Sequence, residues 1–426
     1  MKQIKDAVPS KHEIPKQVAE SHKTYSRKYE QVTVLFADIQ GFTKIVEHIN
    51  PEFLVDQLDK YFFKFDEIVE KYGIEKIKTI GDAYMCAGGI PDHNRTNPIE
   101  VILAAVEMQQ FMKEENQGND TTSNVWELRI GIHTGPVVSG LVGRVKISFD
   151  IWGDTVNIAS RMESSGVAGE INITGVTYQY IRDFFICQYR GKMPIKYKGE
   201  TDMYFVKGII PELSRDNLGL EPNEDFMIRL QHMRFGDLEE FVLGRLRTEL
   251  GESLVYHNLE HTVNVLTRAE VLARGEGVSE GDLLIVKTAA LLHDIGFLIA
   301  YPNHEANSTA LAKEILPKFK YSPHQIDRVI ELVMATRTDQ IPNNILEEII
   351  KDADLDYLGR SDYVHLSRQL YLEMTANGIS IEEGQWIQTQ YEFIKNHKYY
   401  TSTAKRLRQV NKVRQLEKLK MLLEVA

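Results

Sequence analysis

The sequence predicts two domains of different class, an α+β domain followed by an all-helical one. A chain of 426 residues is too long for one ordinary hydrophobic core. β-branched runs alternate with amphipathic stretches up to about residue 210, and the β signal almost vanishes beyond that point. With 43% hydrophobic and 26% charged residues, the composition is that of a soluble globular protein.

The strand signals lie in the first half. Strands are predicted where β-branched and aromatic residues cluster, at residues 32–36, 74–80, 128–133 and 170–173. Two intervening segments, 51–72 and 98–114, carry apolar residues at three- and four-residue spacing, which predicts amphipathic helices. Strands interleaved with helices indicate an α/β or α+β sandwich.

The second half is predicted to be helical, and a polar segment precedes it. Residues 211–225 hold two prolines, two asparagines and several acids, which predicts a linker. Helices are predicted at residues 239–250, 259–274, 282–292, 308–316, 323–334 and 403–425. The expected domains are an N-terminal extension (1–28), a first domain (29–210), the linker (211–225) and a helical domain (226–426).

Composition and charge argue against several classes of protein. The net charge of −11 gives no support for a nucleic-acid surface. No apolar run approaches the ~20 residues that cross a bilayer, and the N-terminal segment is polar, unlike a signal peptide. Two cysteines cannot form a disulfide framework. We therefore expect a cytoplasmic protein that binds neither nucleic acid nor membrane.

Two aspartates follow apolar strands in the first domain. Asp38 ends the run that starts at Val32, and Asp82 directly follows Gly81 in Lys78-Thr-Ile-Gly-Asp-Ala-Tyr84. Carboxylates that converge from neighbouring strands can hold two Mg²⁺ ions, which prefer oxygen ligands and keep substrate phosphates in their shell. Taken singly, each acid is more often a turn residue or a helix cap.

A third segment, residues 149–163, adds a helix with a polar face. Asp154 or Thr155 is expected to cap this helix, and Asn157 and Arg161 then lie four residues apart on one face. A permanently charged arginine suits charge that grows on a phosphoryl oxygen, and an asparagine can orient a ribose. The alternative is an ordinary pair of polar surface residues.

Together, these segments resemble the class III adenylyl and guanylyl cyclases, over roughly residues 29–208. The resemblance implies a ferredoxin-like βαββαβ core. It also implies that Asp38, Asp82 and the backbone of Ile39 bind two Mg²⁺ or Mn²⁺ ions. Asn157 and Arg161 would stabilise the transition state of cyclisation. A homodimer is implied as well, with metal ligands from one subunit and the other functional residues from its partner.

The same resemblance assigns the substrate contacts. Lys78 and Asp150 would read the base, Phe42 and Thr43 would contact the substrate, and Lys198 would grip the triphosphate in a segment where Glu200 also lies. Lysine can only donate a hydrogen bond and an ionised aspartate can only accept, so Lys78 and Asp150 complement the N1 acceptor and 6-amino donor of adenine. ATP is the predicted substrate, with GTP as the alternative.

A histidine and aspartate pattern marks the second domain. His257 and His261 lie one helical turn apart, His293 adjoins Asp294, and Asp354 follows in Lys351-Asp-Ala-Asp. A lone histidine is usually a surface or core residue, whereas this combination is rare by chance. Imidazole and carboxylate ligands together suit Mn²⁺, Fe²⁺, Zn²⁺ or Mg²⁺. Such a centre can activate water for attack on phosphorus.

This pattern resembles the HD superfamily of metal-dependent phosphohydrolases, over roughly residues 226–397. The resemblance implies that the metal ligands are His261, His293, Asp294 and Asp354. His257 would protonate the leaving oxygen. Weaker assignments add a second metal and a phosphate contact, at His304-Glu305 and Arg337 respectively.

Two alternatives stay open at this level. The helical domain is either a phosphohydrolase, which would act on the cyclic nucleotide made next door, or a ligand-sensing domain that regulates the cyclase. The cyclase domain could also be degenerate and serve only in dimerisation. Degenerate copies typically lose a metal-binding aspartate or the arginine, and this chain keeps Asp38, Asp82 and Arg161.

Overall fold

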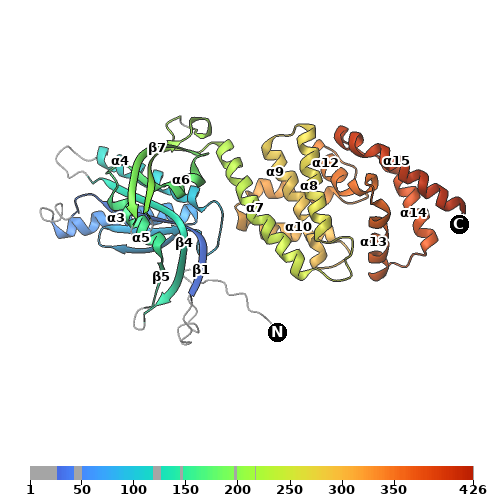
Figure 1. Cartoon of the computed structure of the whole chain (residues 1–426), viewed down its shortest axis with the longest axis horizontal. Helices are drawn as coiled ribbons and strands as arrows, with labels where there is room; N and C mark the ends of the chain where they lie inside the picture. Colours follow the sequence, from blue (N-terminus) through green and yellow to red (C-terminus); the bar gives the residue numbers. More distant parts are fainter. Residues whose placement is uncertain are drawn as a thin grey trace. The chain divides into compact units, whose positions relative to one another are not determined.

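The computed structural model describes residues 26–42, 50–118, 126–143, 147–195, 199–215 and 217–425. The chain forms two compact units that divide between Leu230 and Gln231 (Figure 1). The first unit is α+β, and the described residues of the second contain helices and no strand. Both predicted fold classes are confirmed.

A mixed sheet of eight strands forms the first unit. In chain order its elements are β1 (Ser26–Ile39), α3 (Pro51–Tyr72), β2 (Glu75–Ile80), β3 (Ala83–Gly88), α4 (Asn97–Gly118), β4 (Leu128–Val142), β5 (Ser148–Trp152), α5 (Asp154–Ser164), β6 (Ile171–Thr174), α6 (Gly175–Ile181), β7 (Phe185–Ile195) and β8 (Gly199–Ile209). The strand order is β2-β3-β1-β4-β6-β8-β7, with β5 paired to the end of β4. The first six elements make the predicted βαββαβ core, because β1 lies between β3 and β4.

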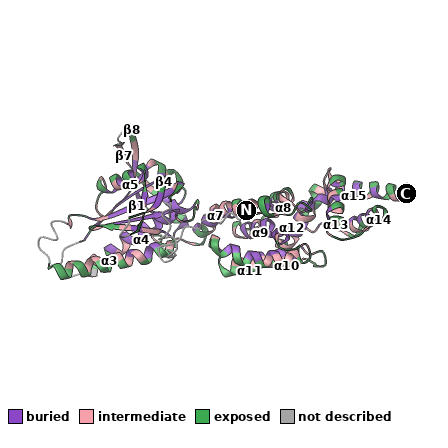
Figure 2. Ribbon diagram, turned by 90° about the horizontal axis from the view of Figure 1, so that it is seen from below, coloured by how far each residue is buried: buried purple, intermediate pink, exposed green. Residues whose placement is uncertain are grey.

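Helices cover both faces of this sheet. Successive side chains of β1 point to opposite faces. Val34 packs in one cluster with Ala159 of α5, whereas Thr33 donates a hydrogen bond of 2.7 Å to Asn97 at the start of α4. α5 therefore packs on one face, and α4 with its neighbour α3 on the other. Figure 2 shows the strands as the buried centre, while α3 keeps an exposed side.

The residues predicted to form a linker are folded onto the first unit. The Ile209 N–H donates to the Gly219 carbonyl at 2.8 Å, beyond the 3-10 turn η1 (Pro211–Leu213). A Cβ on Gly208, whose φ is +140°, would lie 3.0 Å from that carbonyl oxygen, so the turn requires glycine. The chain then enters α7 (Glu224–Glu249), where Phe226 packs edge-on against Phe184 at 4.9 Å. The predicted domain limits stay a prediction.

The second unit consists of helices and short 3-10 turns. After α7 these are α8 (Leu259–Glu276), α9 (Glu280–Leu292), η2 (Ile295–Leu298), α10 (His304–Ile315), η3 (Leu316–Phe319), α11 (Pro323–Ala335), α12 (Ile345–Asp354), η4 (Leu355–Gly359), α13 (Tyr363–Ala376), α14 (Glu383–Asn396) and α15 (Ser402–Val425). All six predicted helices are present. α12, α13 and α14 are additional.

Two hydrophobic clusters organise the second unit. The larger one is built on helices α7 to α12, with α9 buried on nearly every side. The smaller one joins Tyr256 and Tyr357 to Tyr363 of α13 and Ile394 of α14. The second cluster thus fixes α13 and α14 beside the start of α8, where the histidines lie. No described helix is both long and apolar enough to span a membrane.

Candidate active sites

Two strand ends bring Asp38 and Asp82 together in the first unit. Asp38 is the second-last residue of β1, and Asp82 follows Gly81 in the two-residue turn between β2 and β3. Gly81 has a φ of +62°, which favours glycine and permits the tight turn. Because β3 pairs with β1, the turn ends beside Asp38, and the two carboxyl groups are in hydrogen-bonding contact.

This contact changes the acidity of Asp82. Burial raises its pKa, and the negative charge of Asp38 raises it further, to about 6. The backbone N–H of Ile39 donates to the Asp82 carboxylate and offsets part of the shift. Two carboxylates that repel each other in this way fit divalent cations, which neutralise both charges. The predicted ligand set of Asp38, Ile39 and Asp82 is therefore brought together.

Arg129, which the sequence analysis does not identify, lies beside Asp38 and Asp82 (together, the acid pair). Arg129 of β4 is opposite Asp38 in the sheet, and its Nη2 donates to Asp38 Oδ2 at 3.1 Å. Its Nε donates to Oε1 of Glu163 at 2.5 Å. Burial raises the pKa of Glu163, Arg129 lowers it, and Asp38 and Asp82 raise it again. Arg129 thus pairs with two carboxylates, and Asp82 adds a third beside Asp38, so the site carries excess negative charge in the absence of cations.

Lys78 and Asp150 form an ion pair within the same chain. The Nζ of Lys78, on β2, lies 2.6 Å from Oδ2 of Asp150, on β5. The other carboxylate oxygen of Asp150 accepts from the Ile151 N–H at 2.9 Å, which fixes the orientation of the carboxylate. Lys78 keeps 41% of its side chain exposed, so the pair remains accessible to a ligand. The structure brings together both residues that the sequence predicts to read the base.

α5 presents Asn157 and Arg161 to solvent on one face. Both are exposed, and neither side chain has a hydrogen bond or ion pair with the rest of the described chain. Their exposure makes them available to groups from outside this chain. The expectation that Asp154 or Thr155 caps the helix is wrong. Gly153, with a φ of +140°, is the N-cap, and Thr155 instead donates to a backbone carbonyl.

Among the described residues, none of the remaining predicted substrate contacts joins the cyclase site. Phe42 packs edge-on against Trp126 at 6.3 Å, on the protein's own core. Thr43 and Lys198 lie outside the described residues. Glu200, near the expected position of the triphosphate lysine, is within 3.8 Å of Lys192.

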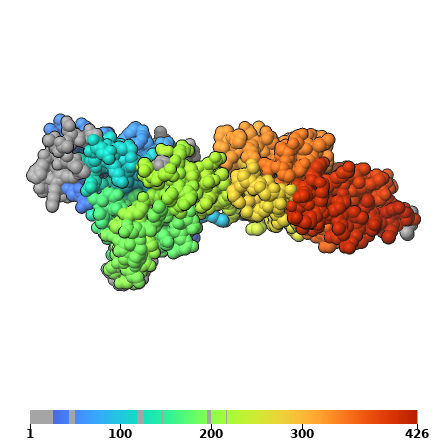
Figure 3. Space-filling model, turned by 90° about the horizontal axis from the view of Figure 1, so that it is seen from above, coloured from blue at the N-terminus to red at the C-terminus, as the bar shows by residue number. Residues whose placement is uncertain are grey.

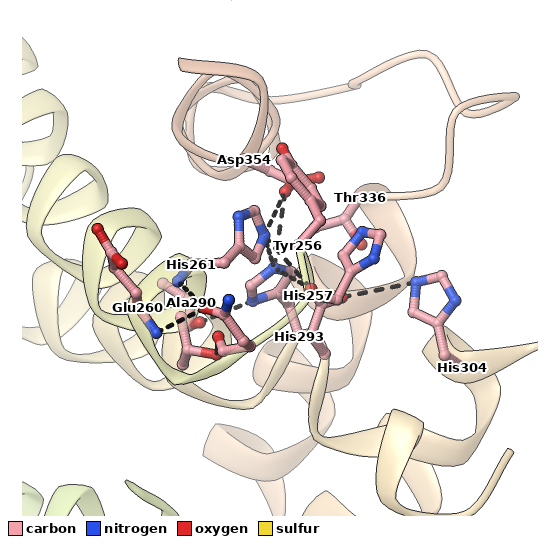
Figure 4. Close-up of polar contacts among 12 residues, drawn as sticks. Tyr256, His257, Glu260, His261, Ala290, His293, His304, Thr336 and Asp354 are labelled. Atoms are coloured by element: carbon pink, nitrogen blue, oxygen red, sulfur yellow. Dashed lines mark hydrogen bonds and ion pairs between the residues drawn. The ribbon is translucent and has the colours of Figure 1, made fainter. Parts of the chain in front are cut away.

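In the second unit, His261, His293, Asp294 and Asp354 converge from three parts of the chain. Asn258 caps α8 and places His261 in its first turn, His293 and Asp294 follow α9, and Asp354 ends α12. The two histidine Nε2 atoms are 3.2 Å apart. His293 Nε2 lies 3.1 Å from Asp294 Oδ2, and His261 Nε2 lies 3.3 Å from Asp354 Oδ1. Figure 4 shows His261, His293 and Asp354 directed at one centre.

These residues fit a metal ion. His293 Nδ1 donates to the Ala290 carbonyl at 2.8 Å, so Nε2 is the nitrogen available to a cation. Oδ2 of Asp294 is buried 3.1 Å from His293 Nε2 and 3.3 Å from His261 Nε2, but neither contact has the alignment of a hydrogen bond. Burial lowers the pKa of His293, but Asp294 and Asp354 outweigh it and raise the pKa well above its usual value. A divalent cation would replace that proton and satisfy the orphaned oxygen.

Glu373, which sequence reasoning also misses, fixes His257. This fully buried carboxylate of α13 accepts from His257 Nδ1 through Oε1. Its Oε2 accepts from the backbone N–H groups of Tyr256 at 2.8 Å and His257 at 2.9 Å. His257 Nε2 is thereby left for a ligand. No local signal identifies Glu373, because it lies more than a hundred residues from its partners.

The weaker assignments have different outcomes. His304 Nε2 lies 3.5 Å from Asp294 Oδ1, so His304 adjoins a candidate metal ligand (Figure 4), and it also lies 3.6 Å from Glu305 Oε1. Phe297 is stacked between His304 at 4.1 Å and His257 at 4.6 Å, which positions both rings. Arg337 instead pairs with its neighbour Asp339 at 3.0 Å.

Both sites lie within segments of the chain that match known family models. Residues 24–208 match the model of the adenylate and guanylate cyclase catalytic domain, and residues 258–356 match the HD domain model. The cyclase match includes the acid pair, the Lys78–Asp150 pair and α5. The HD match includes all four candidate metal ligands but ends before α13 and α14.

Curated relatives of the first unit include cyclases of both kinds. The chain is 38% identical over 200 residues to an adenylate cyclase of Mycobacterium tuberculosis. The matched segment covers 46% of this chain and 44% of that protein. It is 36% identical over 214 residues to guanylyl cyclase C of Homo sapiens. That match covers 49% of this chain and 20% of that protein. The chain thus spans less than half the length of these relatives. Among solved structures, the adenylyl cyclase of P. aeruginosa is 31% identical, over 43% of this chain and 95% of that chain, with a TM-score of 0.40.

Proposed function

Because this chain contains an adenylate and guanylate cyclase catalytic domain followed by an HD domain, we propose that it converts ATP to 3′,5′-cyclic AMP and pyrophosphate. We further propose that its HD domain hydrolyses a phosphoester. The two activities would use separate metal sites, one in each unit. The cyclase proposal rests on the acid pair, and the choice of base rests on Lys78 and Asp150.

One observation carries the cyclase proposal: Asp38 and Asp82 touch each other at the ends of paired strands. When bound there, Mg²⁺ or Mn²⁺ would supply Lewis-acid stabilisation and lower the pKa of the substrate hydroxyl. The 3′-hydroxyl oxygen would attack the α-phosphorus, and pyrophosphate would leave. Arg129, already paired with Asp38, holds a permanent positive charge at the same place.

The ion pair between Lys78 and Asp150 favours adenine. Each would exchange its present partner for one edge atom of the base, the lysine donating and the aspartate accepting. Guanine presents the opposite pattern, so at least one bond to a charged group would be lost. Such a loss costs about 1.5–3 kcal/mol. The kcat/KM for GTP should then be lower by roughly 10- to 150-fold for each lost bond.

Product analysis with ATP and GTP tests this proposal. The chain is incubated with Mg²⁺ or Mn²⁺, in an Asp354→Asn background so that the second unit cannot consume the product. We expect cyclic AMP from ATP, and a shift of preference toward GTP in the double variant Lys78→Glu, Asp150→Cys. Lys76→Glu on the same strand is the matched control, because Lys76 pairs with Asp66 instead. Equal rates with ATP and GTP would contradict the adenine assignment.

We also propose that each cyclase site is shared by two copies of the chain. Asn157 and Arg161 are exposed and unpaired within the described chain, as expected of groups that act in a partner's site. Asp38→Ala and Arg161→Ala proteins should each be inactive. Random mixing makes half of the dimers mixed, with one intact site each, so about a quarter of the activity should return. No recovery in verified mixed dimers would refute shared sites.

The HD proposal rests on the buried histidine and aspartate cluster beside His257. A cation held by His261, His293, Asp294 and Asp354 would supply an activated water and neutralise phosphate charge. His257, positioned by its hydrogen bond to a buried carboxylate, would give a proton to the leaving oxygen. Incubation with cyclic AMP and Mn²⁺ tests whether the HD domain hydrolyses the proposed product of the cyclase domain. Metal binding without any phosphoester hydrolysis would favour a sensory domain.

A further inference from the structure

Asp354 is the last residue of α12, where the helix passes into the 3-10 turn η4. Its Oδ1 lies 3.3 Å from His261 Nε2 and 3.6 Å from His293 Nε2, two further candidate metal ligands. The last turn of a helix lacks part of its backbone hydrogen bonding and frays easily. The position of the Asp354 carboxylate therefore depends on what holds the chain on either side of it.

Asp352, two residues before Asp354, holds the start of the C-terminal helix α15. Residues two apart in a helix point to nearly opposite sides, so Asp352 faces away from the candidate metal ligands. Its side chain is 1% exposed. The carboxylate accepts from the Tyr400 N–H at 3.0 Å and from the Thr401 N–H at 2.8 Å. Thr401 Oγ1 also donates to Asp352 Oδ2 at 2.8 Å and accepts from the Ala404 N–H at 3.2 Å, so the same hydroxyl caps α15.

Asp356, two residues after Asp354, binds the same helix from η4. Its side chain is 6% exposed. Arg408 of α15 donates to both carboxylate oxygens, from Nε to Oδ1 at 2.7 Å and from Nη2 to Oδ2 at 2.9 Å. This paired geometry fixes the orientation of the carboxylate as well as its charge. A Cβ on Gly359 would lie 2.6 Å from the Cβ of Arg408, so η4 and α15 are in close contact.

A second arginine ties the Asp356 carboxylate to α8. Arg268 Nε lies 2.8 Å from Asp356 Oδ1. Arg268 follows His261 by seven residues on α8, so both side chains lie on the same face of that helix. Figure 3 shows the C-terminal residues, in red, packed against the yellow part of the same unit, and α15 contacts α8. Asp356 thus joins the helix that carries His261 to the turn that follows Asp354.

We propose that Arg408 is a positioning residue for the candidate metal centre. Through Asp356 and Arg268 it holds Asp354 at the separation from His261 that a cation requires. Asp352 secures the other side of Asp354 against the same helix. This inference rests on the proposed metal site of the HD domain, and it adds a helix that lies beyond the family match, which ends at residue 356.

A positioning contact differs from a purely structural one in its effect on metal affinity. A purely structural contact stabilises the metal-free and metal-bound forms equally, so its removal lowers Tm and leaves the Kd of the metal unchanged. Removal of a group that orients a metal ligand weakens metal binding by roughly 10- to 100-fold. Because Arg408 acts through Asp356 and not on Asp354 directly, we expect the lower end of this range.

Titration calorimetry with Mn²⁺ measures this effect in the full chain. The Asp38→Ala background is used, so that the proposed metal site of the first unit does not contribute. Arg408→Gln removes the charge and the paired hydrogen bonds, and should raise the Kd for Mn²⁺ about tenfold. At about 100 times the parent's Kd, stabilisation by Mn²⁺ should then fall from about 2.7 to about 1.4 kcal/mol. Arg408→Lys keeps the charge without the paired geometry and should raise the Kd less.

Two control variants separate positioning from general loosening of the unit. Arg414→Gln changes an exposed arginine on the same helix, which bonds to Asn411 at 3.3 Å, and should leave the Kd unchanged. Leu246→Ala removes a side chain of the larger hydrophobic cluster and should lower Tm with the Kd unchanged. A rise in Kd in Leu246→Ala as large as that in Arg408→Gln would overturn the inference.

Thr401→Val tests the contact on the other side of Asp354, and serves as a second variant if Arg408→Gln fails to fold. It removes the hydroxyl that bonds to Asp352 and should also raise the Kd for Mn²⁺, whereas Thr401→Ser, which keeps the hydroxyl, should not. Folded Arg408→Gln and Thr401→Val proteins with the Kd of the parent would overturn the inference and leave the metal site standing. A parent chain that binds no Mn²⁺ would refute the metal site itself, and the inference with it.

Discussion

Replacing Glu373 with glutamine tests whether a buried carboxylate positions the proposed acid His257. Glu373 is fully buried and accepts hydrogen bonds from two backbone N–H groups and from His257 Nδ1, and the Tyr301 hydroxyl is a further partner. A glutamine oxygen can still accept from the two backbone groups. Its NH₂ then faces His257 Nδ1 and cannot accept from it. The variant Glu373→Gln therefore loses one bond to a charged group, worth about 1.5–3 kcal/mol.

The expected effect is large enough to measure by calorimetry. For a unit of about 200 residues, 1 kcal/mol shifts Tm by about 2–4 °C. Glu373→Gln should therefore lower the Tm of the second unit by roughly 3–12 °C. The transition of this unit is identified by its response to Mn²⁺. Glu383→Gln is the control, because Glu383 is exposed on α14 and its loss should cost no more than about 0.5 kcal/mol.

The difference between wild type and variant should also depend on pH. Burial raises the pKa of Glu373, but His257 and the two backbone N–H groups outweigh it and lower the pKa below its ordinary value. A carboxyl group with a lowered pKa stabilises the fold above its unfolded pKa of about 4.3 and loses that contribution as pH falls further. The Tm gap should thus narrow below about pH 4.3. In phosphoester hydrolysis, kcat should fall while KM stays unchanged. An unchanged Tm together with an unchanged kcat would refute the positioning role.

Four further predictions concern metal binding and packing. Saturating Mn²⁺, at about 100 times its Kd, should stabilise the second unit by about 2.7 kcal/mol, and calorimetry should show this gain largely lost in Asp354→Asn. The Asp354→Asn protein allows Mn²⁺ binding to the first unit to be measured alone. This binding should weaken progressively as pH falls below about 6, because protonated Asp82 cannot act as a ligand. Titration with Mn²⁺ should show no such pH dependence when Asp82→Asn is added. Gly131→Ala should destabilise the first unit by about 1–3 kcal/mol and abolish cyclisation, because the added Cβ would lie 1.8 Å from the Glu163 backbone nitrogen in α5. Gly244→Ala, with open space around it, should leave stability unchanged or improve it by up to about 1 kcal/mol in denaturant unfolding.

The sequence predicts most of the fold because local periodicity follows burial. The helix predicted at residues 51–72 has the same bounds as α3, since its apolar stripe packs on one side only. β3, β5, β7 and β8 are not predicted, and in β7 and β8 polar and charged residues interrupt the apolar runs. The N-cap of α5 is also mispredicted. Gly153, with a φ of +140°, occupies the N-cap of that helix, a position where a polar side chain is more common.

Sequence alone determined the identity of the chemistry-bearing residues that lie in short, patterned segments. Asp38, Asp82, His261, His293 and Asp294 each stand in a run whose neighbours are diagnostic. These residues can be identified from such runs because each lies at or near the end of a strand or helix. The candidate metal ligands of both units are proposed from such runs.

Only the tertiary structure decided which distant residues complete the two sites. Arg129 meets Asp38 because β4 pairs with β1, and Glu373 meets His257 because α13 packs beside the start of α8. These contacts join residues separated by 90 or more positions, and each partner is unremarkable in its own segment. Pairing across a sheet or between helices is set by the burial of whole faces, which no short stretch of sequence records.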